Sequence, residues 1–255
     1  MESIGEILKR RREQSLTLSP RPSDHKSPPE ELCQVCQGAR FVHRIIDGRP
    51  DYGAMVACRH CMTPEDIRKM LGVSSLDSTF ANFKVVKGTE NAYQSAKLIA
   101  GMETDWKLLL IYGTWGCGKT HLLEAIALAM WDSGVAVKIQ TFPDFVAGLK
   151  ATFDRSRVSG YVGPTFNERI ESLCKMPYLL LDDVGAAGSF TQFSLEQLER
   201  IMLARYRENL FTVITTNLDY DKLPEFVQSR FNDSEKARRV LNEGADYRPI
   251  KGGRK

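Results

Sequence analysis

The stretch from residue 108 to residue 130, LLLIYGTWGCGKTHLLEAIALAM, constrains the fold more than any other part of the chain. It opens with five apolar or aromatic residues, continues with a glycine-spaced loop, and ends in an apolar run. Glycines allow backbone conformations that side chains exclude, so several backbone amides in such a loop can turn toward one point. We therefore expect a buried strand, a tight loop and a helix in immediate succession.

The loop GTWGCGKT fits the P-loop pattern, with Gly113, Gly118, Lys119 and Thr120 in the required places. Backbone amides and the helix dipole attract phosphate oxygens at such a position. We expect Lys119 to neutralise the β- and γ-phosphates and the Thr120 hydroxyl to hold Mg²⁺. The residues expected to bind nucleotide here are Gly113, Thr114, Trp115, Gly116, Cys117, Gly118, Lys119 and Thr120. Cys117 is expected to contribute only its backbone.

Two later apolar stretches end in polar side chains. YLLLDDVG delivers Asp182 and Asp183, and FTVITTN delivers Asn217. Because ligands bind at the carboxyl ends of strands in open α/β sheets, we expect these groups beside the phosphates. Asp182 is predicted to bind Mg²⁺, directly or through water, and Asp183 to orient the attacking water. Asn217 is predicted to sense the γ-phosphate, which makes ATP and Mg²⁺ the expected ligands of this site.

Strands and helices alternate through the second half of the chain, and this order predicts an α/β fold. We expect a parallel five-stranded sheet with helices on both faces, and a separate capped helix over TPEDIRKMLG at residues 63–72. The expected strands are 107–112, 135–140, 178–182, 211–215 and 237–241, and the expected helices are 90–100, 119–132, 142–153, 165–175, 194–208 and 221–230.

Four of the six cysteines, Cys33, Cys36, Cys58 and Cys61, form two C-x-x-C pairs near the N-terminus. Such pairs supply the thiolates of a tetrahedral zinc site, and the segment between them contains turns and short apolar stretches, as in a zinc ribbon. The alternative is a small core of reduced thiols. A closed site with four thiolates leaves no position for water, so the expected Zn²⁺ supports folding rather than catalysis.

The remaining N-terminal sequence divides into short units. Residues 1–14 place Ile4, Ile7 and Leu8 on one helical face ahead of a basic run, which fits either a docking helix or a solvated terminus. Residues 15–31 hold four prolines and are expected to be a linker. We assign residues 32–75 to a zinc-binding leader and 76–255 to the large domain. With no long apolar run or secretory signal, a cytoplasmic protein without membrane contact is expected.

The motif order GTWGCGKT, LLLDDVG, VITTN, VQSRF and DYR resembles the AAA+ ATPases of the DnaC, DnaI and IstB group, bacterial helicase loaders and transposition helpers. The resemblance spans about residues 76–250 and includes STFANF, where Phe80 and Phe83 match an aromatic lead-in beside the adenine. It implies that Arg230 is an arginine finger that reaches the nucleotide of a neighbouring subunit. The pairs CQVC and CRHC resemble the leader of DnaI-like loaders.

Three features depart from the family pattern. Ala187 stands where most relatives carry an acidic residue after the aspartate pair. The sequence ends at Lys255, too early for the helical lid of a full AAA+ module, so we expect no lid. Arg248 of the DYR motif matches a family position, but no role in nucleotide binding is assigned to it.

The resemblance implies an ATPase that loads a replicative DNA helicase, binds single-stranded DNA and assembles with itself in the presence of ATP. An IstB-like transposition helper acting on double-stranded DNA, or an adaptor without catalysis, are the alternatives. The insertion at residues 142–166 combines basic and aromatic side chains that fit a strand-binding groove or an ordinary solvated helix face. Those side chains are Lys150, Phe153, Arg155, Arg157 and Tyr161.

Overall fold

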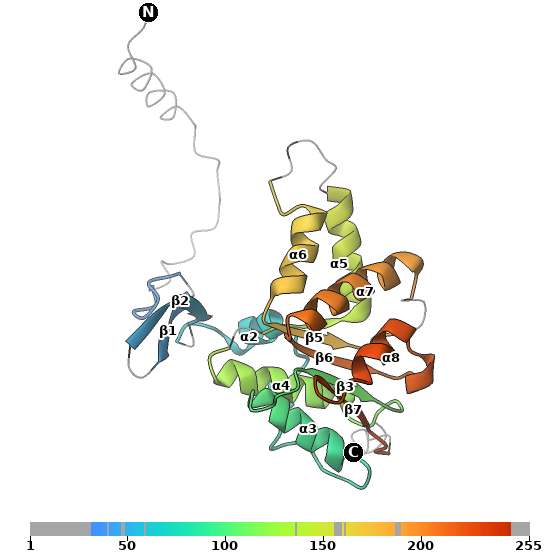
Figure 1. Ribbon diagram of the computed structural model, residues 1–255. Helices are drawn as coiled ribbons and strands as arrows, with labels where there is room; N and C mark the ends of the chain where they lie inside the picture. Colours follow the sequence, from blue (N-terminus) through green and yellow to red (C-terminus); the bar gives the residue numbers. More distant parts are fainter. Residues whose placement is uncertain are drawn as a thin grey trace, which may run out of the picture.

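Five parallel strands form the central sheet in the order β4-β5-β6-β3-β7, which confirms the predicted α/β fold (Figure 1). In the register of β3 and β6, Leu110 lies opposite Ile214 and Tyr112 lies opposite Thr216, so both strands end at the same edge. The strands are β3 (Leu108–Tyr112), β4 (Ile139–Thr141), β5 (Tyr178–Asp182), β6 (Phe211–Thr216) and β7 (Ala237–Leu241).

The computed structural model describes residues 32–39, 41–46, 49–58, 60–135, 137–155, 160, 162–186 and 190–245. The predicted N-terminal helix, the linker, Ala187 and Arg248 lie outside the described residues, as do Arg157 and Tyr161 of the insertion.

Helices cover both faces of the sheet. Successive residues of each strand point to opposite faces, so each apolar strand contributes side chains to two cores. Leu109 and Ile111 pack in one core with α2, α3 and α4, whereas Leu108 and Leu110 pack in the other with α5 to α8 (Figure 1). The helices are α2 (Pro64–Leu71), α3 (Glu90–Ala100), α4 (Lys119–Asp132), α5 (Phe142–Arg155), α6 (Phe166–Lys175), α7 (Gln192–Arg207) and α8 (Glu225–Phe231). No helix in the described part of the chain is long and apolar enough to cross a membrane.

Helix α2 forms as its sequence predicts. The Thr63 hydroxyl accepts a hydrogen bond from the amide of Asp66 at 3.1 Å, Pro64 opens the first turn, and Gly72 ends the helix with a φ of 71°. Leu71 and Val73 are buried in the core that covers one face of the sheet. The helix assigned by sequence to the leader therefore packs on the large unit.

A two-stranded antiparallel hairpin, β1 (Phe41–Ile46) and β2 (Arg49–Ala57), separates the two cysteine pairs (Figure 1). Phe41 pairs with Ala57, so the chain leaves the hairpin beside the point where it entered. The hairpin thus returns the second cysteine pair to the first.

Two elements differ from the predicted ones for local reasons. The expected strand 135–140 is reduced to β4, and Val135 and Val137 are buried outside it. The expected helix 221–230 splits into a 3₁₀ turn, Tyr220–Lys222, and α8. Pro224 explains the break, because a residue before proline avoids helical backbone angles and Leu223 is extended, with a ψ of 154°.

Arg205 of α7 is fully buried and connects three elements. Its guanidinium donates to the Thr212 hydroxyl at 2.9 Å and to the Phe211 carbonyl at 2.6 Å in β6. It also donates to the carbonyls of Leu173 and Met176, at 2.9 and 2.7 Å, which end α6. Burial lowers the pKa of Arg205 to about 10, so the side chain is still cationic at neutral pH.

Replacing Arg205 with methionine should destabilise the large domain by at least about 3 kcal/mol, because each buried acceptor left without a donor costs about 1–3 kcal/mol. The exposed Arg207, two residues further along α7, is the matched control, and Arg207→Met should stay within about 0.5 kcal/mol of the parent. Urea unfolding followed by circular dichroism measures both. Equal midpoints for the two variants would contradict this role of Arg205.

Candidate nucleotide-binding site

A cavity of about 900 Å³ lies at the carboxyl edge of the sheet. One wall is the P-loop between β3 and α4, and another is the segment before α3, which includes Ser78 and Phe83. The ends of β5 and β6 complete it with Asp182, Asp183, Thr215 and Asn217. The structure therefore brings the side chains from three separate sequence motifs to one place.

The P-loop needs its glycines. Gly113 and Gly118 have φ angles of 145° and 92°, and a Cβ on Gly113 would lie 2.2 Å from the Asn242 carbonyl oxygen. Gly118 also caps the N-terminus of α4. The amides of residues 116–118 donate to no acceptor in the described part of the chain. Unpartnered amides at a helix N-terminus are suited to an anion.

Lys119 is held inside the loop that precedes it. Its ammonium group donates to the carbonyls of Gly113 at 2.9 Å and Thr114 at 2.6 Å, and the side chain is buried. Burial lowers the pKa of Lys119. Neutral carbonyls compensate a buried charge only in part, so an anionic phosphate is a better partner for this ammonium group.

The predicted Mg²⁺ ligands already contact one another. The Thr120 hydroxyl donates to one Asp182 oxygen at 2.9 Å, and the Thr215 hydroxyl donates to the other. Asp182 is buried, and this burial raises its pKa. Hydroxyl and carboxylate oxygens suit Mg²⁺, so Thr120 and Asp182 fit the ion. Thr215 was not among the predicted site residues, although it belongs to a polar pair, Thr215 and Thr216, that precedes Asn217 in an apolar strand.

Asp183 is fixed in an uncommon conformation. Its φ is 56°, a left-handed value rarely adopted by residues other than glycine. The Asn217 side-chain amide donates to the Asp183 carboxylate, and the Asp183 amide donates to the Thr215 hydroxyl at 3.1 Å. Asp183 and Asn217 therefore act as one hydrogen-bonded unit beside Asp182.

Of the two aromatic residues predicted near the adenine, Phe83 lines the cavity. It stacks on Tyr93, with ring centroids 5.6 Å apart, and meets the edge of His121 at 5.2 Å. Phe80 is not among the residues that line the cavity. Its ring lies edge-on to the Tyr93 ring, with ring centroids 5.8 Å apart. The His121 Nε2 lies 2.9 Å from the Thr79 carbonyl and connects α4 to the aromatic segment.

Arg230 lies away from these residues. It is half-exposed on α8, where its guanidinium lies 6.0 Å from the centre of the Tyr206 ring and 3.5 Å from the Phe226 carbonyl. The structure does not bring Arg230 to the nucleotide cavity of its own chain. Its assignment as an arginine finger stays a prediction about a neighbouring copy.

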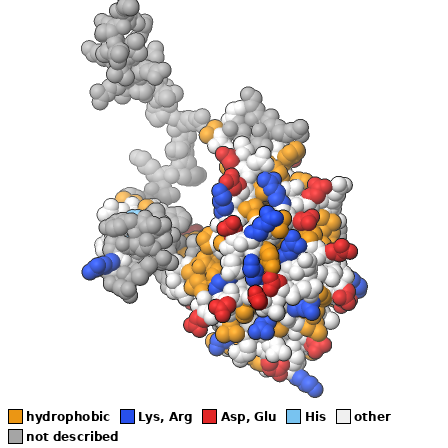
Figure 2. Space-filling view, in the orientation of Figure 1, with side chains coloured by type: hydrophobic (Ala, Val, Ile, Leu, Met, Phe, Trp, Pro, Cys, Tyr) orange, Lys and Arg blue, Asp and Glu red, His pale blue; other side chains and the backbone are white. Residues whose placement is uncertain are grey.

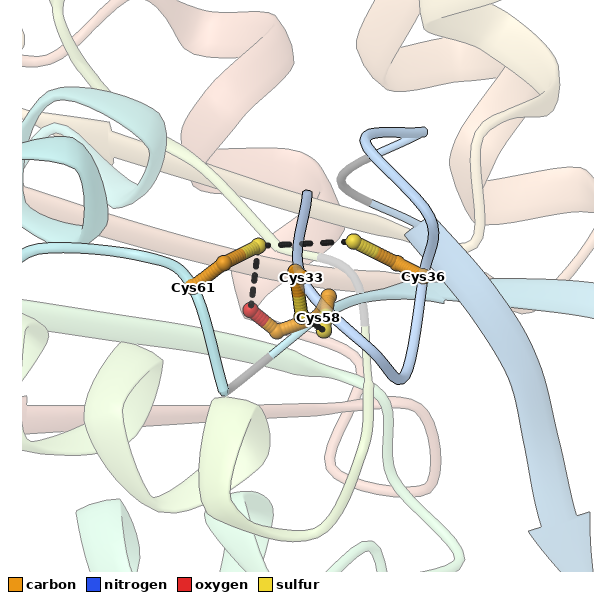
Figure 3. Close-up of side chains that lie close together, drawn as sticks. All are labelled: Cys33, Cys36, Cys58 and Cys61. Atoms are coloured by element: carbon orange, nitrogen blue, oxygen red, sulfur yellow. Dashed lines mark hydrogen bonds between the residues drawn. The ribbon is translucent and has the colours of Figure 1, made fainter. Parts of the chain in front are cut away.

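The four leader cysteines converge, with all four Sγ atoms within 4.8 Å of one another (Figure 3). Cys33 and Cys58 are 3.7 Å apart, and Cys36 and Cys61 are 3.4 Å apart. A tetrahedral Zn²⁺ with Zn–S bonds of about 2.3 Å would place sulfurs about 3.8 Å apart. The hydrogen bond with Cys36 raises the pKa of Cys61 to about 12, so a cation is needed for all four thiols to ionise. The residues present therefore fit a metal ion.

Comparisons with known proteins agree with this geometry. The replicative helicase loader DnaI of Bacillus subtilis is 29% identical over 138 residues, covering 53% of this chain and 42% of that protein. The structure of the DnaC helicase loader has a TM-score of 0.54 at 20% identity, covering 66% of this chain and 98% of that one. The replication initiator DnaA, bound to AMPPCP and single-stranded DNA, has a TM-score of 0.56 at 22% identity, covering 67% and 51%.

The structural likeness confirms the predicted AAA+ fold, and the match to DnaI confirms the expected resemblance to DnaI-like proteins. The chain spans less than half the length of the curated DnaI relative. The family model described as the bacterial DnaA ATPase domain matches residues 75–232, more than half of the chain. The chain therefore belongs to the bacterial DnaA ATPase-domain family.

Proposed function

We propose that this protein is an ATP-dependent helicase loader that binds single-stranded DNA and delivers a replicative DNA helicase during replication. The observation that carries the proposal is the convergence of Lys119, Thr120, Asp182, Asp183 and Asn217 around one cavity. A four-cysteine leader precedes that cavity in the same chain. Similarity to DnaI of Bacillus subtilis, which is described as a replicative helicase loader, supports this function.

The geometry supports ATP hydrolysis with defined roles. The Lys119 ammonium group exchanges the Gly113 and Thr114 carbonyls for phosphate oxygens, and the unpartnered amides of residues 116–118 bind the same phosphates. Thr120 and Asp182 would hold Mg²⁺, and the bound ion would supply charge neutralisation at the phosphates. Asp183, whose carboxylate accepts a hydrogen bond from Asn217, would orient the attacking water.

The insertion supplies a surface for single-stranded DNA. Phe153 on α5, Phe166 on α6 and Phe193 on α7 form a row, with ring centroids 5.5 and 6.1 Å apart. The exposed Lys150 lies 5.8 Å from the Phe193 ring, and Arg155 is exposed near the end of α5. Figure 2 shows Lys and Arg side chains over α5, α6 and α7, among acidic ones. Aromatic faces beside cations suit stacked bases and phosphates.

A first experiment separates nucleotide binding from turnover. Lys119→Ala should abolish ATP binding in calorimetry, because it removes the buried charge at the phosphates. Asp183→Asn should bind ATP normally but hydrolyse it roughly a hundredfold more slowly, because only the carboxylate that orients water is lost. The same proteins then test loading, by capture of the replicative helicase of the same organism. We expect capture by the parent and Asp183→Asn in ATP, and none by Lys119→Ala.

Lys175→Ala, which removes an exposed lysine paired with Glu171 on α6, is the matched control and should behave as the parent in all three assays. Equal ATP affinity in Lys119→Ala and the parent would overturn the nucleotide assignment. Failure of the parent to capture the helicase with or without ATP would overturn the loader assignment alone.

A second experiment tests a shared active site. Arg230→Ala should bind ATP within a few-fold of the parent but lose hydrolysis about a thousandfold or more, as expected for an arginine finger. Mixing Arg230→Ala with Lys119→Ala should restore activity, because a mixed interface pairs an intact P-loop with an intact finger. The ATPase rate is measured against mixing ratio with single-stranded DNA present. Mixtures that co-assemble but never exceed either variant alone would leave Arg230 without a trans role.

A third experiment removes the metal. The purified protein should carry about one zinc per chain by elemental analysis, and replacing both Cys33 and Cys36 with serine should remove it. Structural zinc contributes roughly 10–16 kcal/mol in small sites, so the leader should unfold while ATP binding persists. Cys174→Ser, at a cysteine of α6 outside the cluster, should keep the zinc. Stoichiometric zinc in the double variant would contradict the site.

A further inference from the structure

Asn242 lies directly behind the P-loop, although it follows the loop by more than a hundred residues. It comes after the last residue of β7, and its amide donates to the Tyr112 carbonyl at 2.8 Å, which continues the β3–β7 ladder. The next amide, of Glu243, donates to the Gly88 carbonyl at 3.0 Å. The backbone of Asn242 is therefore fixed between the end of β3 and the segment that precedes α3.

The side chain of Asn242 holds the middle of the P-loop. It is fully buried, and its Nδ2 donates to the Cys117 carbonyl at 2.9 Å. In a planar trans peptide the C=O and N–H bonds point in opposite directions. Holding the Cys117 carbonyl toward Asn242 therefore directs the Gly118 amide away from Asn242. That amide has no acceptor in the described part of the chain.

Asn242 also bounds the start of the loop. Its carbonyl oxygen lies 2.2 Å from the position of a Cβ on Gly113, so the two backbones are in close contact. One residue thus contacts both Gly113, where the loop leaves β3, and Cys117, just before α4. The loop is supported at both ends from the edge strand of the sheet.

Packing alone does not explain an asparagine here. The Asn242 Oδ1 is buried, and it has no hydrogen-bond partner in the part of the chain that the structure describes. A buried acceptor without a donor costs roughly 1–3 kcal/mol, so an apolar side chain of similar shape would fill this space more favourably. The observation that distinguishes asparagine from leucine is the hydrogen bond to the Cys117 carbonyl.

We propose that Asn242 is a positioning residue for nucleotide binding: by holding the Cys117 carbonyl, it keeps the Gly118 amide directed at the phosphates. The proposal rests on the proposed binding of ATP at the P-loop. Asn242 does not touch nucleotide itself. Its contribution is therefore specific to ligands that carry phosphates at the loop.

The test compares Asn242→Leu and Asn242→Ala with Glu243→Gln, an exposed neighbour on the same segment. Calorimetry measures ATP and adenosine binding, and thermal unfolding without ligand reports the fold. We expect ATP affinity to fall about tenfold in both Asn242 variants, with adenosine affinity unchanged. Asn242→Leu should unfold within a few degrees of the parent, because it removes the unpaired oxygen. Glu243→Gln should match the parent throughout.

A folded Asn242 variant with parental ATP affinity would overturn the positioning role, as would equal losses for ATP and adenosine. Loss of the fold in both variants would assign Asn242 to the core and overturn it as well. A parent that binds ATP no better than Lys119→Ala would instead overturn nucleotide binding at this loop, so the two failures are distinguishable.

Discussion

Two opposite charges, Lys119 and Asp182, are buried at one edge of the parallel sheet, and the arrangement of the site depends on how they are compensated. Removing either charge from water is unfavourable, and burial lowers the pKa of Lys119 and raises that of Asp182. In the described residues, no hydrogen bond joins Lys119 to Asp182. Lys119 donates to carbonyls and Asp182 accepts from hydroxyls, so the hydrogen-bond partners of each charge are uncharged groups. A magnesium nucleotide would bring an anion for the Lys119 ammonium group and a cation for the Asp182 carboxylate, and would so compensate both buried charges.

The order of the strands makes this arrangement possible. Because β6 lies between β3 and β5, Thr215 can donate to Asp182 while its main chain pairs with β3. The same strand carries Asn217 to Asp183. On the other side of β3, the edge strand β7 ends just before Asn242, which lies behind the P-loop. The segment after β7 therefore supports the P-loop, whereas β6 and the residue that follows it hold the aspartate pair.

Sequence patterns predicted most of this architecture, and the failures have physical causes. The P-loop, the aspartate pair and Asn217 are local motifs on strand ends, and a parallel sheet must collect them at one edge. The broken helix at Pro224 was predictable in principle from the proline itself. Asn242 was not, because its role depends on contact with Cys117 across 125 positions, which no local pattern encodes. Strand 135–140 was predicted too long because Val135 and Val137 are buried in the core but lie outside β4, so their apolar side chains indicated burial rather than strand pairing.

The cysteine leader is connected to the helix beside the nucleotide cavity through α2 and the residues just after it. Helix α2 follows Cys61, and its Leu71 is buried in the same core as residues of α4, the helix that begins with Lys119. Just after α2, the Ser74 amide donates to the buried Glu124 carboxylate of α4 at 2.5 Å, and a Cβ on Gly72 would lie 2.2 Å from the Ile139 carbonyl. Packing this close leaves little room for α2 to shift without moving α4 or β4. The segment that follows the leader cysteines is therefore held, through Gly72 and Ser74, against β4 and against α4, the helix that begins with Lys119.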